Sequence, residues 1–323
     1  MPLNPPISLP RDRGSVQRAV LISTTCGLLS AIGYSIANVF LRAVAHCDPV
    51  WVSAMKAAPN VLLVGPWLLL LYLRGHRFLP EPHVLKRLVL GALVAQVFGN
   101  VLFQWSLGVV GLAMAVPLCL GTIILGGALL GRIFLNEPLT IRTLFSVGLL
   151  IGAISVLSLG AAEAQRSVSA GLDDVTSADS WWRLAAGVAG ATVSGMAYAV
   201  LGVVIRYGVT GRATLSVTVF IVGVVGVISL GSLSLWQIGW QGILATSSDD
   251  LTVMLLAGLM NTAAFLALTR AFQLATVVYV NALNATQVGM AAIAGVLLFQ
   301  EALSRELTLG ILLTIAGLLL MKR

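Results

Sequence analysis

The sequence predicts an all-α integral membrane protein with ten transmembrane helices, built as two inverted five-helix repeats with both termini in the cytoplasm. Three observations support this fold class. Only 10% of the 323 residues are charged and 58% are hydrophobic, whereas soluble domains carry about 25% charged residues. Apolar runs of about 20 residues, the length that a helix needs to cross a bilayer, recur along the chain. The second half also repeats the first at a constant offset of 164 residues.

The repeat is visible mainly in polar residues, because matches among Val, Leu and Ala arise by chance in so apolar a chain. The most informative matched pairs are Ser30 and Ser194, Tyr34 and Tyr198, Arg42 and Arg206, Thr122 and Thr286, and Glu137 and Glu301. An odd number of spans in each copy turns the second copy upside down relative to the first. Inverted repeats of this kind are typical of transporters that open one midplane site to alternate sides.

The predicted elements follow in order along the chain. Residues 1–18 form a basic tail, and the apolar run after it is too long for a signal peptide, so we expect a retained first span. In the first repeat, residues 19–160, we expect spans at 19–41, 50–73, 88–109, 112–135 and 142–160. A segment rich in Asp, Ser and Ala, residues 161–183, is the expected linker. In the second repeat, residues 184–323, we expect spans at 184–207, 215–235, 251–272, 276–299 and 307–321.

The distribution of Lys and Arg predicts the orientation. With the N-terminus inside, the inner segments hold fourteen of these residues, and the outer segments hold only Arg42, Arg166, Arg183 and Arg305. Both termini are therefore expected in the cytoplasm. Arg42 and its repeat partner Arg206 fall on opposite sides, as an inverted repeat requires.

The same distribution limits the partners that we expect. The net charge of +7 comes from basic residues in short segments between apolar runs, where lipid headgroups account for them. We therefore expect a lipid bilayer and a small-molecule substrate as partners, and no nucleic acid. A receptor or assembly subunit would have sizeable soluble regions, but the longest linker has only about 20 residues. We expect the protein to be a monomer.

Residues that could carry chemistry are few. The three cysteines show no CxxC or other ligand spacing, and their odd number gives no disulfide framework. We therefore expect no metal and no cofactor. An enzyme acting on a lipid carrier would need paired acids or histidines at a membrane face. The three histidines are isolated and Asp249–Asp250 stands alone, so we expect that the protein is not an enzyme.

Polar side chains inside the spans are the candidates for a binding site, because such groups are costly unless they face a cavity or another helix. The candidate cavity residues are Tyr34, Asn38, Lys56, Asn100, Gln104, Trp105, Tyr198, Asn261, Tyr279, Asn281, Asn284 and Gln287. Lys56 could pair with a substrate carboxylate or bond helix-end carbonyls; the alternative is a lysine that snorkels to the membrane surface.

Spacing groups several of these candidates. Asn100 and Gln104 are four residues apart and so share one face of a helix, beside Trp105, whose ring could hold a flat substrate. The alternative for these amides is hydrogen bonding between helices. Asn281, Asn284 and Gln287 stay near one stripe of the ninth span, which suggests that they line the substrate path. Tyr34 and Tyr198 could serve either substrate binding or packing.

Acidic residues are confined to the ends of the spans. Glu137 and Glu301 close the fourth and ninth spans, where capping of a turn or a gate contact is expected. No Asp or Glu falls in the central part of any predicted span. Proton-coupled pumps commonly use such a carboxylate, so we expect uncoupled movement of a neutral or zwitterionic solute.

Two matching motifs carry a resemblance to a known family. The segment LNEPLT at residues 135–140 is followed by Gly148 and Gly152, and QEALS at 300–304 is followed by IAGLLLM. This arrangement resembles the EamA repeat of the drug/metabolite transporters, in which a Glu closes the fourth and ninth spans. The length, the ten spans and Lys56 are most similar to the YddG-type aromatic amino-acid exporters.

The resemblance implies a function and a location. We expect an alternating-access transporter of a bacterial inner membrane that exports small metabolites, among them amino acids with aromatic side chains. The alternative is a drug/metabolite or sugar-type carrier of the same fold, which could be proton-coupled. A carrier of nucleotide sugars or phosphate esters would need several convergent basic residues, and only Lys56 lies clearly inside a span.

Overall fold

The computed structural model describes residues 13–75, 79–137, 177–301 and 304–321, together with scattered positions between 141 and 156. All regular secondary structure in these residues is helical. Eight helical segments are long and apolar enough to cross a membrane, and they correspond to the first four predicted spans and to the sixth through the ninth. The fifth predicted span, 142–160, lies largely outside the described residues.

The first half of the chain contributes the helices α1 to α5. Their bounds are α1 Arg13–Ala43, α2 Pro49–Leu73, α3 Pro82–Val94, the π-helical turn η1 Ala95–Val101, α4 Leu102–Val110 and α5 Leu112–Leu135. The segments α3, η1 and α4 together form the third membrane-spanning element. This element begins six residues before the predicted start at 88, where Pro82 occupies a first-turn position that needs no N–H.

The second half contributes the helices α8 to α14. Their bounds are α8 Ser177–Val209, α9 Leu215–Gln237, α10 Gly239–Leu244, α11 Ser248–Leu274, α12 Val277–Asn284, α13 Gln287–Phe299 and α14 Arg305–Met321. The ninth predicted span is broken between α12 and α13, and α14, with 17 residues, covers the tenth. Side-chain caps start three of these helices, with Thr214 capping α9, Ser247 capping α11 and Thr276 capping α12.

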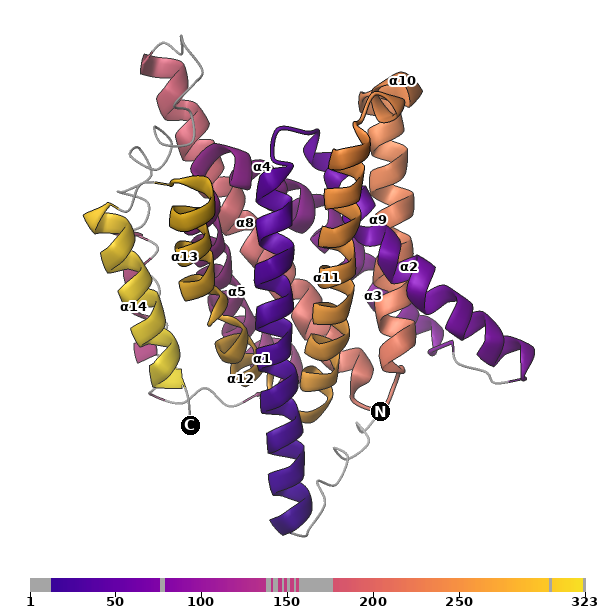
Figure 1. The fold of residues 1–323 in the computed structure, drawn as a ribbon. Helices are drawn as coiled ribbons and strands as arrows, with labels where there is room; N and C mark the ends of the chain where they lie inside the picture. The colour runs from indigo at the N-terminus through magenta and orange to yellow at the C-terminus, as the bar shows by residue number, and fades with distance from the viewer. Residues whose placement is uncertain are drawn as a thin grey trace.

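The two halves of the chain interlock rather than pack as separate bundles (Figure 1). Helix α1 packs along α11, α5 along α8, and α2 along α9, so that each extensive interface joins one helix from each half. The core divides into two large apolar clusters, one around Leu107 and Met114 and the other around Leu88 and Phe272. Tyr198 packs against both clusters and therefore lies where they meet.

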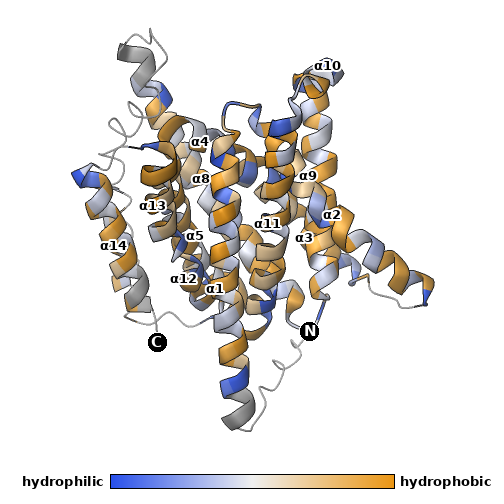
Figure 2. Ribbon diagram, viewed as in Figure 1, coloured by the Kyte–Doolittle hydropathy of each residue, from blue (hydrophilic) through white to orange (hydrophobic). Residues whose placement is uncertain are grey.

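Hydrophobic residues predominate along the helices (Figure 2), and many of their side chains are exposed, as lipid-facing side chains are. Large hydrophobic side chains such as Trp67, Leu129, Ile228 and Leu297 are more than half exposed. Several polar side chains are buried beside the apolar core, among them Lys56 and several amides. The apolar exposed side chains, together with a buried lysine, agree with a multi-pass membrane protein.

Candidate functional site

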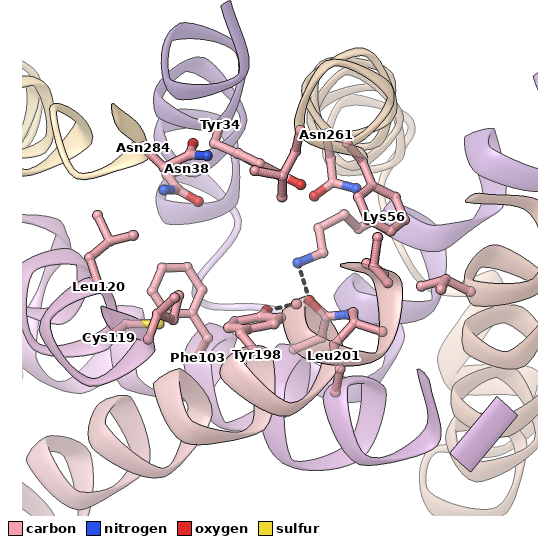
Figure 3. A pocket seen from close by; sticks show the side chains of 18 of the residues that line it. Tyr34, Asn38, Lys56, Phe103, Cys119, Leu120, Tyr198, Leu201, Asn261 and Asn284 are labelled. Atoms are coloured by element: carbon pink, nitrogen blue, oxygen red, sulfur yellow. Dashed lines mark hydrogen bonds between the residues drawn. The ribbon is translucent and has the colours of Figure 1, made fainter. Parts of the chain in front are cut away.

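A cavity of about 160 Å³ lies among the helices, with a wall that draws residues from both halves (Figure 3). The sequence candidates that line it are Tyr34, Asn38, Lys56, Asn100, Tyr198, Asn261, Asn281, Asn284 and Gln287. They come from α1, α2, η1, α8, α11, α12 and α13. The chain thus brings together side chains that lie up to 253 residues apart in sequence, such as Tyr34 and Gln287.

Lys56 points into the cavity and does not snorkel to the membrane surface (Figure 3). Only 6% of the residue is exposed. Its Nζ donates a hydrogen bond to Asn100 Oδ1, which also accepts one from the Tyr198 hydroxyl. Of the three donors on the ammonium, this network uses one, and Lys56 is the one charged side chain among the described residues of the wall.

The π-helical turn η1 holds this network in place. Asn100 Nδ2 donates to Gln96 Oε1, and Gln96 Nε2 donates to the backbone oxygen of Val222 on α9 at 3.0 Å. Both amides lie within η1 and both line the cavity. Short π-helical segments are frequent at functional sites because they reposition side chains within a helix.

The same turn explains why Gln104 does not line the cavity with Asn100, as its spacing predicts. A π-helical turn changes the rotational register of the residues that follow it. Gln104 is buried and its Nε2 donates to the backbone oxygen of Leu41 on α1 at 2.9 Å. Its place is therefore at a contact between helices, which was the alternative interpretation of this amide.

A second polar group lies at the break between α12 and α13. Asn284 Oδ1 accepts from Ser30 Oγ at 3.2 Å and from Gln287 Nε2 at 2.9 Å. These contacts orient the amide so that its Nδ2 is buried without a protein partner, and the Nδ2 of Asn281 is in the same condition. Asn38 lies beside Asn284 (Figure 3) and donates to Gln287 Oε1 at 3.5 Å. Unpaired buried donors are costly, so a bound solute that accepts hydrogen bonds would be favoured here.

Apolar and aromatic side chains complete the wall. Phe103, Phe265, Phe272 and Leu120 line the cavity together with the polar groups. The cavity therefore combines hydrogen-bonding positions with a surface suited to an apolar side chain.

Two polar residues of the wall were missed by the sequence interpretation. Asn60 lies one helical turn after Lys56, and its Oδ1 is buried without a partner. Gln96 lies one turn before Asn100. The cost of a polar group inside a span, which singled out the other candidates, applies equally to these two residues.

Trp105 and Tyr279 are not part of the cavity wall. Trp105 packs beside Gly190 of α8, where the absence of a side chain leaves room for the indole. Tyr279 turns toward α1, and its hydroxyl lies 2.7 Å from Thr24 Oγ1. The structure places both aromatic rings at contacts between helices.

Glu301 joins three elements at one end of the bundle. Its carboxylate accepts from the backbone N–H groups of Leu112 and Ala113 at 2.8 and 2.7 Å, and it pairs with Arg42 Nε at 3.0 Å. It therefore caps the N-terminus of α5, where the helix dipole favours negative charge. The Glu301 side chain is 4% exposed.

Glu137 makes the matching arrangement at the opposite end. It accepts from the backbone N–H of Val277 at 3.3 and 3.2 Å, at the start of α12, and its carboxylate lies 3.6 Å from Arg206 Nε. The contacts are longer than those of Glu301, and the Glu137 side chain is 12% exposed. Burial raises the pKa of Glu137 above its ordinary value, and the charge of Arg206 opposes that shift.

The backbone around the two glutamates repeats as well. Asn136 and Gln300 have a left-handed conformation, each with φ of 53°. The following N–H groups, those of Glu137 and Glu301, bond to the carbonyls of Gly131 and Gly295, six residues earlier. In both helices the left-handed residue ends the helix and reverses the chain, as left-handed C-terminal residues do, so that each glutamate turns back toward the other repeat. The pairing of Arg42 with Glu301, and of Arg206 with Glu137, was not predicted, although the repeat had matched all four residues.

Comparison with known proteins agrees with this architecture. The model of the EamA-like transporter family matches residues 21–159 and again residues 185–323. The chain is also similar to a protein of known crystal structure, with 15% identity and a TM-score of 0.60 over 92% of this chain and 95% of that one. No curated protein matches it significantly in sequence. The two family matches cover most of the chain, which therefore belongs to the EamA-like transporter family, membrane transporters of the drug/metabolite type.

Proposed function

We propose that this transporter moves small zwitterionic metabolites, amino acids with aromatic side chains among them, by uncoupled alternating access through the central cavity. In this proposal the protein exports its substrate across a bacterial inner membrane. The observation that carries the proposal is the composition of the cavity wall. The described wall holds one cation, Lys56, several amides and no carboxylate.

This wall is complementary to a carboxylate attached to an apolar group. Lys56 supplies an ammonium with unused donors, and Asn281 and Asn284 supply buried Nδ2 groups without partners. Asn60 Oδ1 is an unpartnered acceptor that could receive a hydrogen bond from a substrate ammonium. A zwitterionic amino acid satisfies both kinds of group, whereas a lipophilic cation would meet Lys56 with no counter-ion.

The size of the cavity suits the aromatic side chain of such a substrate. An apolar cavity of about 150 Å³ in another protein is large enough to bind benzene, and the cavity here has about 160 Å³. Phe103, Phe265 and Phe272 offer ring faces and edges for such a group. A larger substrate would require a wider conformation of the transporter.

A sugar-type or phosphate-bearing substrate is the competing proposal within the family. Phosphate esters are bound by several convergent Lys and Arg side chains. The described wall provides Lys56 alone. For the same reason proton coupling through a cavity carboxylate is disfavoured, since the wall has no such group among the described residues.

The two arginine–glutamate pairs suit the role of gates. Each pair ties a helix of one repeat to the start of a helix of the other, and the pairs lie at opposite ends of the bundle. Opening one end of the cavity requires separation of the repeats at that end, and so breaks one pair while the other holds. Glu301 and Glu137 are the gate residues in this proposal, with Arg42 and Arg206 as their partners.

Transport by the purified protein in liposomes tests the proposal. We expect uptake of radiolabelled tryptophan and phenylalanine above that of threonine, without any ion gradient and unchanged by an imposed proton gradient. The control is Lys86→Gln, which removes an exposed lysine of α3 and should leave uptake intact. Transport that follows the proton gradient quantitatively would refute the uncoupled mechanism, and absence of amino-acid transport would refute the substrate class.

A further inference from the structure

Three potential metal ligands converge at the end of the bundle where Glu301 lies. His46 and Cys47 follow α1 in the turn that leads to α2, and Asp250 lies in the first turn of α11. One ligand atom from each of these residues lies within 4.8 Å of the other two. The sequence predicted no metal site because its ligands are separated by about 200 residues, so no motif spacing reveals them.

The geometry is already partly organised for a cation. His46 Nε2 lies 3.3 Å from Asp250 Oδ1. The other oxygen of Asp250 accepts from Ser247 Oγ at 2.7 Å, which fixes the orientation of the carboxylate. In metal sites, a hydrogen bond to the carboxylate oxygen that does not face the metal is typical, because it orients the ligand. Ser247 is itself held as the N-cap of α11 through the backbone N–H of Asp250.

We propose that His46, Cys47 and Asp250 form a binding site for a divalent transition-metal ion, with Zn²⁺ as the ion that suits them best. Imidazole, thiolate and carboxylate are all common zinc ligands, and three protein ligands leave a fourth position for water. Tetrahedral bonds of about 2.0–2.3 Å would bring the ligand atoms to about 3.5 Å from one another. Because His46 is largely exposed, rotation of its side chain can supply most of this contraction.

The surrounding charge favours a cation over an anion. Asp48 precedes α2 directly after Cys47, and Asp249 precedes Asp250, so two further carboxylates lie next to the ligands in sequence. When the metal binds, the Cys47 thiol loses its proton to water and the sulfur bonds to the metal as a thiolate. Affinity must therefore fall as the pH is lowered, since protons compete for the imidazole as well as the thiol.

The position of the site gives metal binding a structural consequence. The ligands join the α1–α2 turn of the first repeat to the start of α11 in the second repeat, at one end of the extensive α1–α11 contact. Arg42, which pairs with Glu301, lies four residues before His46. A bound ion would hold the two repeats together at this end of the bundle.

Titration of the purified full-length protein with Co²⁺ tests the site directly, because a cobalt–thiolate bond produces a charge-transfer absorption band. We expect one equivalent of Co²⁺ to give this band, and Zn²⁺ to remove it by displacement. Cys47→Ser should abolish the band, and His46→Gln and Asp250→Asn should each weaken Co²⁺ binding at least tenfold. The matched control is Cys26→Ser, which changes a thiol on α1 away from the cluster and should leave the titration unchanged.

Thermal unfolding of the same samples provides a second readout. Zn²⁺ should raise the unfolding temperature of the unaltered protein and of Cys26→Ser, and should not raise that of Cys47→Ser, because a ligand stabilises only the state that binds it. Equal unfolding temperatures of all variants without metal confirm that each variant is folded. A Co²⁺ band that persists in Cys47→Ser, or unchanged affinity in both His46→Gln and Asp250→Asn, would overturn the proposal. Neither readout depends on the transport that we propose for the central cavity.

Discussion

Lys56 is a charged side chain buried inside a membrane-spanning helix, with only 6% of the residue exposed. An ammonium inside a span costs about 2.5–3.5 kcal/mol on insertion scales. In this chain Lys56 donates one hydrogen bond, to Asn100 Oδ1, which also accepts from the Tyr198 hydroxyl, and this bond offsets part of that cost. Hydrogen bonds to charged groups contribute about 1.5–3 kcal/mol. If Lys56 binds the substrate carboxylate, Lys56→Gln should lower the initial rate of transport at least about tenfold, since 1.4 kcal/mol corresponds to a factor of ten.

The measurement is counterflow of labelled tryptophan in proteoliposomes with equal amounts of each variant. Lys56→Gln should keep the unfolding temperature of the parent protein or raise it, because a buried charge is removed while one hydrogen bond to Asn100 can still form. Transport by Lys56→Gln at the rate of Lys86→Gln would exclude Lys56 from substrate binding.

Glu301 and Glu137 differ in burial, and their substitution should differ in cost. Glu301 makes three contacts of 2.7–3.0 Å and is nearly inaccessible, so Glu301→Gln leaves Arg42 without its counter-ion and turns an amide N–H group toward backbone donors. We expect a loss of about 3 kcal/mol in stability for Glu301→Gln. Glu137 has longer contacts and greater exposure, and Glu137→Gln should cost about 1 kcal/mol.

Thermal unfolding in one detergent measures both variants against the parent protein. The order of the two unfolding temperatures is the decisive result, because detergent changes their absolute values. A lower unfolding temperature for Glu137→Gln than for Glu301→Gln would contradict the assignment of the tighter contact to Glu301.

The sequence pointed to residues of the cavity wall where a single polar residue stood out in an apolar span. Lys56, Asn281 and Asn284 stand out because each is polar in an apolar span, and the structure places all three in the cavity wall. Trp105 and Tyr279 were chosen for their type, but aromatic rings suit helix contacts as well as cavities. The side toward which a helix turns such a ring depends on packing, which no local pattern encodes.

At the level of elements, close approach of backbones sets the α5–α8 contact. A Cβ atom added to Gly195 of α8 would overlap Thr122 Oγ1 and the backbone oxygen of Cys119 on α5. Both contacting residues belong to the part of α5 that follows Pro117, and one of the contacting atoms is a backbone oxygen, which cannot rotate away. We expect Gly195→Ala to lower the stability by about 1–3 kcal/mol, as overpacking does in other cores.

Gly231→Ala of α9 is the matched control, because a Cβ atom there meets no other atom within 4 Å. Alanine is the better helix former by about 1 kcal/mol, so this variant should be as stable as the parent protein or slightly more stable. The two unfolding temperatures should therefore move in opposite directions. Equal shifts would show that helix propensity, rather than the α5–α8 contact, decides the effect at Gly195.

The helices themselves were largely predictable, but their internal irregularities were not. Apolar length identified eight membrane-spanning elements to within a few residues, because the bilayer imposes both length and composition. The π-helical turn at Ala95–Val101 and the break between Asn284 and Gln287 carry no such signal. Both irregularities lie at the cavity, where unusual backbone is tolerated because it faces polar groups instead of lipid.

At the level of the whole molecule, the two repeats interlock through three extensive interfaces. Helices α1, α2 and α5 each pack against a helix of the other repeat, so a movement between repeats must change all three interfaces together. The cavity is lined by residues of these helices, and the Arg42–Glu301 and Arg206–Glu137 pairs lie at opposite ends of the bundle. The sequence repeat indicated the symmetry, but only the fold revealed that each glutamate meets the arginine of the opposite copy.

The orientation of this molecule in the membrane yields the last prediction. Arg212 precedes the start of α9 and Gln241 follows its end, and both are exposed, so they mark opposite ends of the bundle. The excess of Lys and Arg in the segments on the Arg212 side predicts that this side faces the cytoplasm. In a variant without native cysteines, a membrane-impermeant maleimide should label Gln241→Cys in intact spheroplasts, but Arg212→Cys only after the membrane is permeabilised. The reverse pattern would place Lys and Arg mainly on the outside, and it would also exchange the sides of the membrane on which Glu137 and Glu301 lie.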